Sequence, residues 1–238
     1  MKKSEKNAII KKFKVWFKDT LILNHKINTE KLENINKFNI NPLLLYYLAY
    51  YLQGNATPIS LAKVLVYPRV LSTSITTSFG TSMQSFITDV LGAYGSGIEG
   101  LDIEFFDHID KEKKYCQIKS GPNSINKDDV VTIKGHFRAF INRARTNRLK
   151  INLNNIAFCL IYGEDNEKNS FVRKLEEEYT IYMGKDFWHR FTGDKDFYKD
   201  LIKASAEVAS KVNMKPIVDG VIKKLSKSVE QRLKEISS

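Results

Sequence analysis

The sequence predicts a mixed α/β protein, in which helices flank a small mixed β-sheet with one hairpin and further helices extend both ends. Three observations predict this fold class. Segments 100–105 and 115–121 alternate between apolar and polar residues, which is typical of the two strands of a hairpin. Segment 156–162 is apolar without alternation, which is typical of a strand in the middle of a sheet. Much of the remaining chain repeats its apolar residues at helical spacing.

For the N-terminal part of the chain, the sequence predicts helices only. Residues 1–35 place apolar side chains at helical spacing between lysines, and we expect this segment to pack on the body of the protein. Asn41 is a suitable N-cap for a second helix, with Pro42 at its first position. The Leu- and Tyr-rich run after it is apolar nearly all round, so we expect that helix to be buried. A third helix is expected from about Ser60, with Pro68 inside it or at its end.

The middle of the chain alternates helices with strands. Asn126 begins a helix with acidic residues in its first turn, where they favour the positive end of the helix. The expected elements are, in order, a helix over 81–92, the hairpin, a helix to about Arg148, the strand 156–162, a helix over 171–178, a strand over 179–184, and helices to the end. We expect one domain over 1–238, with a helical N-terminal part (1–70), a core (72–203) and a helical C-terminal part (204–238).

Composition narrows the class of protein. The 238 residues are 42% hydrophobic, which suffices for a core without disulfides. Cys116 and Cys159 lie in apolar strand-like runs, so we expect reduced core residues in a cytoplasmic protein. No apolar run is long enough for a signal peptide or a membrane span, and we expect no membrane partner. The net charge of +11 favours a polyanionic partner, most simply a nucleic acid.

The hairpin gathers polar groups on one face. A hairpin folded about Asp110–Lys111 places Asp102 opposite Lys119. In the same register Glu104 lies opposite Gln117, and the four side chains share one face because strand residues alternate. Oxygen ligands beside a fixed ammonium suit a divalent-cation site. A half-exposed hairpin whose charge pairs add only stability would show the same pattern, so both interpretations stand.

Asp102, a gap of fourteen residues and then Gln117-Ile118-Lys119 resemble the catalytic motif of the PD-(D/E)xK nuclease superfamily, and within it the type II restriction endonucleases. Gln117 stands where the motif usually has an acid, which leaves one carboxylate fewer. Segments 120–129 and 184–194 resemble parts of restriction enzymes that cut short GC-rich palindromes. The resemblance covers about residues 72–203. It implies a restriction-endonuclease-like fold, double-stranded DNA as partner, and a homodimer, because a palindrome mirrors a protein twofold axis.

The resemblance also implies Mg²⁺-dependent hydrolysis of phosphodiester bonds. Asp102 would ligate Mg²⁺, together with the Ile118 carbonyl and the Gln117 amide oxygen. Glu104 would be a second carboxylate or a neighbour of the ligands. Lys119 would orient the attacking water or stabilise the pentavalent phosphate.

Further site residues are expected around the hairpin. The preceding helix would supply one more polar group, for which we prefer Gln84 to Asp89. Asp107 and Asp110 lie nearer the hairpin turn, and we expect both to be exposed to solvent. The expected DNA contacts, on the turn after Lys119 and on one face of the following helix, are Ser120, Asn123, Lys134, Arg138, Arg143 and Arg145.

Three functions remain open on the sequence. The first is a restriction endonuclease, and the second is a repair or structure-specific nuclease of the same fold. The third is a nucleic-acid-binding protein without catalysis, in which the hairpin is merely polar. Independently of these, the basic helix is either a DNA contact or only a solvated face.

Overall fold

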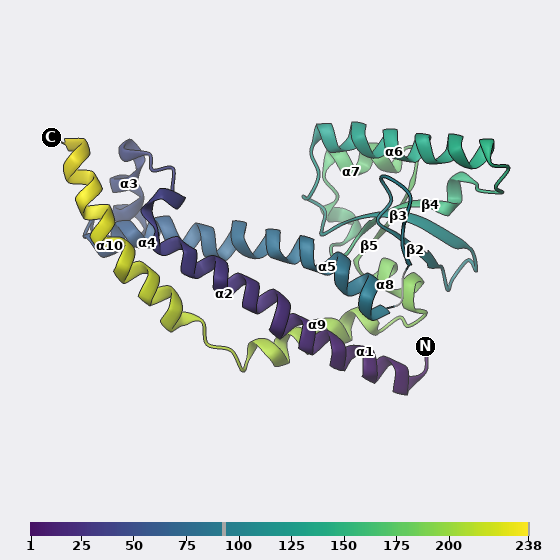
Figure 1. Cartoon of the computed structure of the whole chain (residues 1–238), viewed down its shortest axis with the longest axis horizontal. Helices are drawn as coiled ribbons and strands as arrows, with labels where there is room; N and C mark the ends of the chain where they lie inside the picture. Colours follow the sequence, from purple (N-terminus) through teal and green to yellow (C-terminus); the bar gives the residue numbers. More distant parts are fainter. Residues whose placement is uncertain (92–93, 238) are drawn as a thin grey trace. The chain divides into compact units, whose positions relative to one another are not determined.

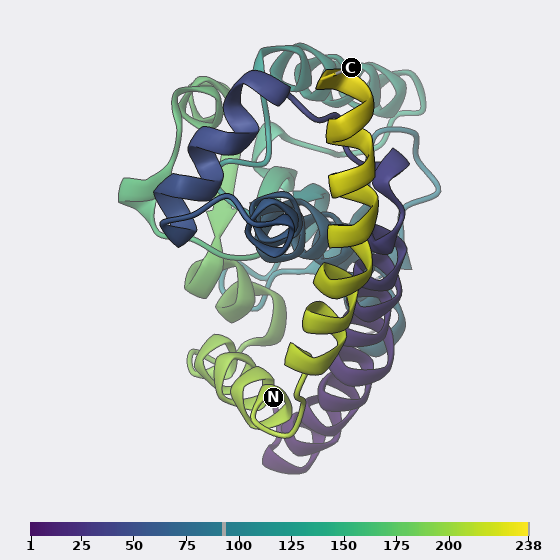
Figure 2. The same cartoon turned by 90° about the vertical axis from the view of Figure 1, so that its left-hand side faces the viewer.

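The computed structural model describes residues 1–91 and 94–237, and the contacts divide the chain into two compact units (Figure 1; Figure 2). Unit 1 comprises residues 1–15 and 80–207, and unit 2 comprises residues 16–79 and 208–238. Unit 1 contains the sheet, whereas unit 2 is helical. Helices from both ends of the chain pack together in unit 2. This division differs from the three consecutive parts expected from the sequence.

Unit 1 is built on one mixed sheet with the strand order β1-β2-β3-β4-β5. The β1–β2 and β2–β3 pairs are antiparallel, and the β3–β4 and β4–β5 pairs are parallel. This confirms the predicted small mixed sheet. β4 is buried throughout and lies between two strands, as its uninterrupted apolar sequence predicted. The strands are β1 (Tyr94–Gly95), β2 (Ile103–Phe106), β3 (Lys113–Lys119), β4 (Ile156–Leu160) and β5 (Thr180–Met183).

Two helices, α6 (Lys127–Thr146) and α7 (Ser170–Glu176), cover one face of this sheet (Figure 1). Phe137 of α6 packs with Phe158 of β4 in a shared apolar cluster. The ring of Phe140 lies 4.9 Å from that of Tyr115 in β3. Since Tyr115 shares its face with the polar side chains of the hairpin, α6 lies over that polar face.

The N-terminus of α6 forms as the sequence predicted. The Asn126 side chain accepts hydrogen bonds from the backbone N–H groups of Asp128 (2.8 Å) and Asp129 (3.0 Å). The Asp129 carboxylate accepts in return from the Asn126 N–H (2.9 Å), which completes a capping box. The start of α6 is therefore fixed to within one residue.

Aromatic side chains of α8 (Gly184–Thr192) pack on the opposite face of the sheet. The Phe105 ring of β2 lies 5.0 Å from that of Phe191 and 6.2 Å from that of Phe187. The buried Trp188 indole donates a hydrogen bond to the Ile161 carbonyl (2.8 Å). The other helices with residues in unit 1 are α1 (Lys3–Trp16), α5 (Ile75–Leu91), α9 (Phe197–Ala209) and the 3₁₀ turns η5 (Leu153–Asn155) and η6 (Asp165–Glu167).

Unit 2 packs its helices around one apolar cluster, to which α4 and α10 contribute most of the buried side chains. Leu61 and Val66 of α4 lie in this cluster with Val221 and Leu225 of α10. The helices of unit 2 are η1 (Phe17–Ile22, a π-helix), α2 (Leu23–Glu30), the 3₁₀ turns η2 (Lys31–Glu33) and η3 (Ile35–Lys37), α3 (Pro42–Gln53), α4 (Pro58–Pro68), η4 (Arg69–Ser74, a π-helix) and α10 (Lys215–Ser237).

The helix expected from about Ser60 begins at Pro58 and leads without a break through η4 into α5. The expected new start near Thr81 is therefore wrong. Pro68 has no backbone N–H and its ring crowds the carbonyl one turn before it. The helix accommodates Pro68 by a wider π turn directly after it and does not end there.

α3 begins as predicted but is not buried. The Asn41 side chain caps it by accepting from the Leu43 N–H (3.1 Å), which confirms the predicted N-cap. Only Leu45 and Ala49 of its residues are buried. The prediction of a buried helix is therefore wrong, because α3 contacts the rest of unit 2 along one narrow stripe and presents its other apolar side chains to solvent.

The hairpin differs from its predicted register by two residues. Glu104 pairs with Tyr115 rather than with Gln117, so the predicted pairing of Asp102 with Lys119 is also wrong. An even shift leaves every side chain on its predicted face. The apolar face is buried as predicted, and the polar face is half-buried.

Asp107 explains the shift. Its Oδ1 accepts hydrogen bonds from the backbone N–H groups of Ile109 (2.7 Å) and Asp110 (3.4 Å), which centres the loop one residue earlier than expected. Its Oδ2 lies 3.0 Å from a guanidinium nitrogen of Arg190, and the side chain is fully buried. The prediction that Asp107 is exposed is thus wrong, whereas Asp110 is exposed as expected, with its carboxylate 2.5 Å from the ammonium of Lys114.

Candidate active site

Asp102 is positioned by the backbone of β3. Its N–H donates to the Cys116 carbonyl (2.8 Å), and its Oδ2 accepts from the Ile118 N–H (2.7 Å). Ile118 lies between Gln117 and Lys119 in the chain. The carboxylate is therefore fixed beside the strand segment that carries the other two residues of the motif.

Gln117 presents a buried acceptor on the same face as Lys119. Its Oε1 has no hydrogen-bond partner within the described part of the chain. A buried amide oxygen without a partner costs free energy, so such an atom points to a ligand that binds there. This oxygen is therefore the atom of the site that most directly indicates a bound ligand.

Lys119 is held by the start of α6. Its Nζ lies 3.6 Å from Oδ1 of Asp129, with 35% of the Lys119 side chain and 30% of the Asp129 side chain exposed. Asp129 uses its other oxygen in the capping box of α6. Sequence reasoning had given Asp129 a capping role only, because the contact with Lys119 depends on how α6 packs on the sheet.

The residues around Asp102 fit a divalent cation with oxygen ligands. The N–H and carbonyl of one strand residue lie on the same strand edge, so the Ile118 carbonyl faces the same side as its N–H, which binds Asp102. Carboxylate, amide and carbonyl oxygens are the ligands that Mg²⁺ prefers, completed by water and phosphate oxygens. No group of three or more Asp, Glu, His or Cys side chains converges on one point within residues 1–91 and 94–237. The fit therefore rests on a mixed donor set with a single Asp.

Glu104 shares the face of the site but is engaged by its neighbours. Its Oε2 lies 2.6 Å from Nζ of Lys113, and its Oε1 accepts from the Ser96 hydroxyl (3.2 Å). A metal ligand role for Glu104 requires this ion pair to open. Gln84 and Asp89 lie on α5, and their side chains are outside what the structure describes.

The turn after Lys119 is tightly packed. The Ser120 carbonyl accepts from the Tyr162 N–H (3.1 Å), and a Cβ added at Gly121 would lie 2.2 Å from the Tyr162 ring. Only glycine fits at position 121 for this reason. Ser120 is half-buried and Asn123 is exposed, so the turn presents Asn123 to solvent beside the start of α6.

The cations of α6 fall into two groups. Lys134 and Arg138 share a face, as their spacing predicted, and both bind Glu178 (2.6 and 3.1 Å). Hydrogen bonds from these two cations lower the pKa of Glu178. Arg143 and Arg145 are exposed in the last turn of α6, where their positive charge interacts favourably with the negative end of the helix dipole.

Comparison with protein families places this chain. A family model described as Type II restriction endonuclease EcoO109I matches residues 17–213, a range that includes the hairpin, the turn after it and α6. No curated protein matches the chain. Every helix in the described residues is too short or too polar to cross a membrane. The chain belongs to the type II restriction endonuclease EcoO109I family.

Proposed function

We propose that this restriction endonuclease hydrolyses phosphodiester bonds of double-stranded DNA at a specific sequence, with Mg²⁺ held at the polar face of the hairpin. Asp102, the Gln117 amide oxygen and the Ile118 carbonyl would hold the ion. The observation that carries this proposal is the buried, unpartnered Gln117 Oε1 one residue from the N–H that fixes Asp102. The family gives the substrate class, and this geometry supports the metal.

The side chains around the site have different roles in the proposed hydrolysis. A bound Mg²⁺ supplies charge that lowers the pKa of water and offsets the negative charge of the phosphate. Asp102 is held by the Ile118 N–H, so its carboxylate keeps one orientation. Lys119 orients the attacking water or stabilises the pentavalent phosphate, and Asp129 keeps its ammonium at the polar face.

The proposed DNA contacts lie on the turn after Lys119 and along α6. Asn123 and Ser120 follow Lys119 directly, and we place them at the backbone or bases near the scissile bond. Arg143 and Arg145 are exposed and suited to phosphate or guanine edges. Lys134 and Arg138 are paired with Glu178, so they can bind DNA phosphates only after their ion pairs with Glu178 open. Guanine contacts by arginine accord with a short GC-rich palindrome as the target.

The α3 surface supports a homodimer. We define it as the exposed apolar side chains of α3, which are Leu43, Leu44, Tyr46, Tyr47, Leu48, Tyr50, Tyr51 and Leu52. Leu43 is 88% and Tyr51 79% exposed, and the helix carries no charged residue. Side chains of this size and exposure present on the order of 900 Å², which exceeds the roughly 300–600 Å² of the largest apolar patch on a typical monomer.

A second copy of the chain is the occupant we propose for the α3 surface. A stable dimer buries roughly 800 Å² of each partner, and the side of this surface that one partner can face supplies a large part of that area. Two chains with a net charge of +11 repel one another, and the uncharged α3 is a place where they can approach closely. A helix that lies on a membrane would pair its apolar face with a lysine-rich one, and α3 has none. The buried free thiols of Cys116 and Cys159 accord with the reducing cytoplasm, where we place the protein.

Digestion of a long DNA of known sequence, followed by sequencing of the fragment ends, tests this function. Discrete fragments that form only with Mg²⁺, with one palindrome at every end, are the expected result. Fragments with unrelated ends, or cleavage only of branched or damaged DNA, would contradict sequence-specific restriction.

A further inference from the structure

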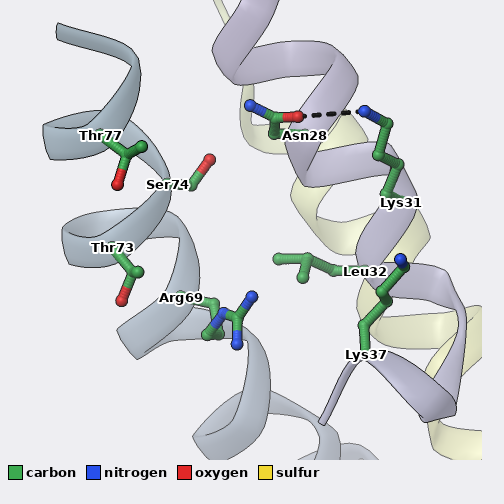
Figure 3. A pocket seen from close by; sticks show the side chains of 8 residues that line it. All are labelled: Asn28, Lys31, Leu32, Lys37, Arg69, Thr73, Ser74 and Thr77. Carbon is green, nitrogen blue, oxygen red and sulfur yellow. Dashed lines mark hydrogen bonds between the residues drawn. The ribbon is translucent and has the colours of Figure 1, made fainter. Parts of the chain in front are cut away.

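Unit 2 contains a pocket of about 270 Å³ that the proposed active site does not use (Figure 3). One wall is formed by α2 and the turns after it, and carries Asn28, Lys31 and Lys37. The facing wall is the π-helix η4, which carries Arg69 and Ser74. Figure 3 shows the Arg69 guanidinium and the Ser74 hydroxyl directed toward the opposite wall.

The pocket concentrates positive charge. Lys31, Lys37 and Arg69 line it, and no carboxylate does. None of these three cations takes part in an ion pair between residues that the structure describes. The acids nearest in sequence to Lys31 are engaged elsewhere, since Glu33 lies 2.7 Å from the ammonium of Lys224 and Glu30 lies 4.0 Å from that of Lys26.

An unpartnered hydroxyl lies in the same pocket. The Ser74 Oγ is buried and finds no hydrogen-bond partner among the residues whose placement is described. It belongs to the π turn that follows Pro68, and π turns occur often at functional sites. The turn brings Arg69 and Ser74 to one wall of the pocket. On the other wall Leu32 points between the walls, and the Lys31 ammonium donates a hydrogen bond to the Asn28 side-chain oxygen (3.2 Å).

We propose that this pocket binds a phosphate of the DNA backbone, as a DNA contact in unit 2. A phosphate oxygen satisfies the Ser74 hydroxyl, and its negative charge meets the three cations. Backbone phosphate contacts of this kind fix the position of a protein on DNA without reading its sequence. The proposal rests on the proposed function in one respect, namely that DNA is the polyanion present.

Binding of a short duplex to the full chain, measured without divalent cations over a range of salt concentrations, tests the proposal. The variant is the triple substitution Lys31→Ala, Lys37→Ala and Arg69→Ala. The matched control removes three exposed lysines of the same unit, Lys211→Ala, Lys223→Ala and Lys227→Ala. Both triples lower the net charge equally, so they differ only in the pocket.

We expect the pocket triple to weaken binding by about ten- to hundredfold, because hydrogen bonds to a charged phosphate are lost. It should also reduce the slope of log K against log salt by about one, for one phosphate released. Ser74→Ala alone should weaken binding in the same direction, and it leaves all charges in place. Equal losses in the pocket triple and the control triple would overturn the proposal.

A free anion is the competing source of the phosphate. Inorganic pyrophosphate should compete with the duplex for the wild type more strongly than for the pocket triple. If pyrophosphate raises the melting temperature of the wild type alone while both triples bind the duplex equally, the pocket takes a free anion and the proposal fails. Retained plasmid cleavage with unchanged binding by the pocket triple would refute the pocket but leave the nuclease intact. Weakened binding in a protein that never cleaves DNA would refute the nuclease but leave the pocket intact.

Discussion

Asp129→Asn is the substitution that separates the two roles of the first turn of α6. Asparagine keeps an oxygen that accepts from the Asn126 N–H, so the capping box survives. It removes the negative charge 3.6 Å from the Lys119 ammonium. The variant therefore isolates the effect of that charge on stability and on cleavage.

The magnitude follows from the geometry of the pair. Both side chains are about one-third exposed, so the ion pair contributes about 0.2–1 kcal/mol after screening by solvent. A charge in the first turn contributes a further ~0.3–1 kcal/mol through the helix dipole. Asp129→Asn should thus lower the free energy of unfolding by about 0.5–2 kcal/mol, which corresponds to roughly 1–8 °C in melting temperature for a chain of this size.

Asp128→Asn is the matched control. Asp128 lies in the same turn and feels the same dipole, but it is exposed and has no ion pair with Lys119. Asp128→Asn should therefore lower the free energy of unfolding only by the helix-dipole contribution of ~0.3–1 kcal/mol. Thermal melts at pH 7 and plasmid cleavage with Mg²⁺, run on both variants, measure the difference.

Cleavage should survive Asp129→Asn, because Lys119 keeps its charge and its strand position. If Asp129→Asn removes cleavage as fully as loss of Lys119 does, Asp129 belongs to the reacting groups and the positioning role given to it here is refuted.

The remaining predictions concern the lysine of the motif, α6 and α3. Lys119→Ala should lower the cleavage rate by about 10²–10³-fold while DNA binding stays near wild type, as measured by single-turnover cleavage and filter binding; a near-normal rate would remove Lys119 from the site. Glu178→Gln should strengthen DNA binding severalfold by releasing two cations of α6. These cations lower the pKa of Glu178 below its usual 4.5, so the carboxylate stays charged near neutral pH. The gain in affinity should therefore be constant from pH 6 to 8. It should shrink only in acid, where Glu178 of the wild type becomes protonated and releases the cations by itself. An unchanged affinity would mean that this face of α6 does not meet DNA. Tyr47→Glu with Tyr51→Glu should convert a dimer to a monomer in sedimentation velocity, whereas Lys223→Ala should not; a wild type that sediments as a monomer would refute the α3 interface.

Local sequence signals predicted most of the hairpin and the helix starts. Alternation along β2 and β3 fixed which side chains share a face, and that result survived the error in register. Asn41 and Asn126 cap their helices as predicted, because a cap depends on residues within one turn. The apolar run of β4 predicted an inner strand for a similar reason.

Features that depend on tertiary contacts were not predictable. The hairpin register is set by the Asp107 carboxylate, which is buried against Arg190. Arg190 is 83 residues away in the sequence, and no local sequence pattern predicts that the two side chains meet. The exposure of α3 could not be foreseen either, because hydropathy shows that a helix seeks apolar contact but not whether the partner is in the same chain. The contact between Lys119 and Asp129 depends on the packing of α6 against the sheet.

The most direct test of the central claim is Mg²⁺ binding and cleavage by Asp102→Asn. If the hairpin holds Mg²⁺, the wild type should melt at a higher temperature with Mg²⁺ than with EDTA, and Asp102→Asn should lose both this difference and plasmid cleavage while it still folds. If the carboxylate only accepts the hydrogen bond of the Ile118 N–H, the substitution should lower stability by at most about 1.5 kcal/mol with or without Mg²⁺ and leave cleavage intact. An Asp102→Asn protein that still cuts DNA in Mg²⁺ would contradict the active site described here.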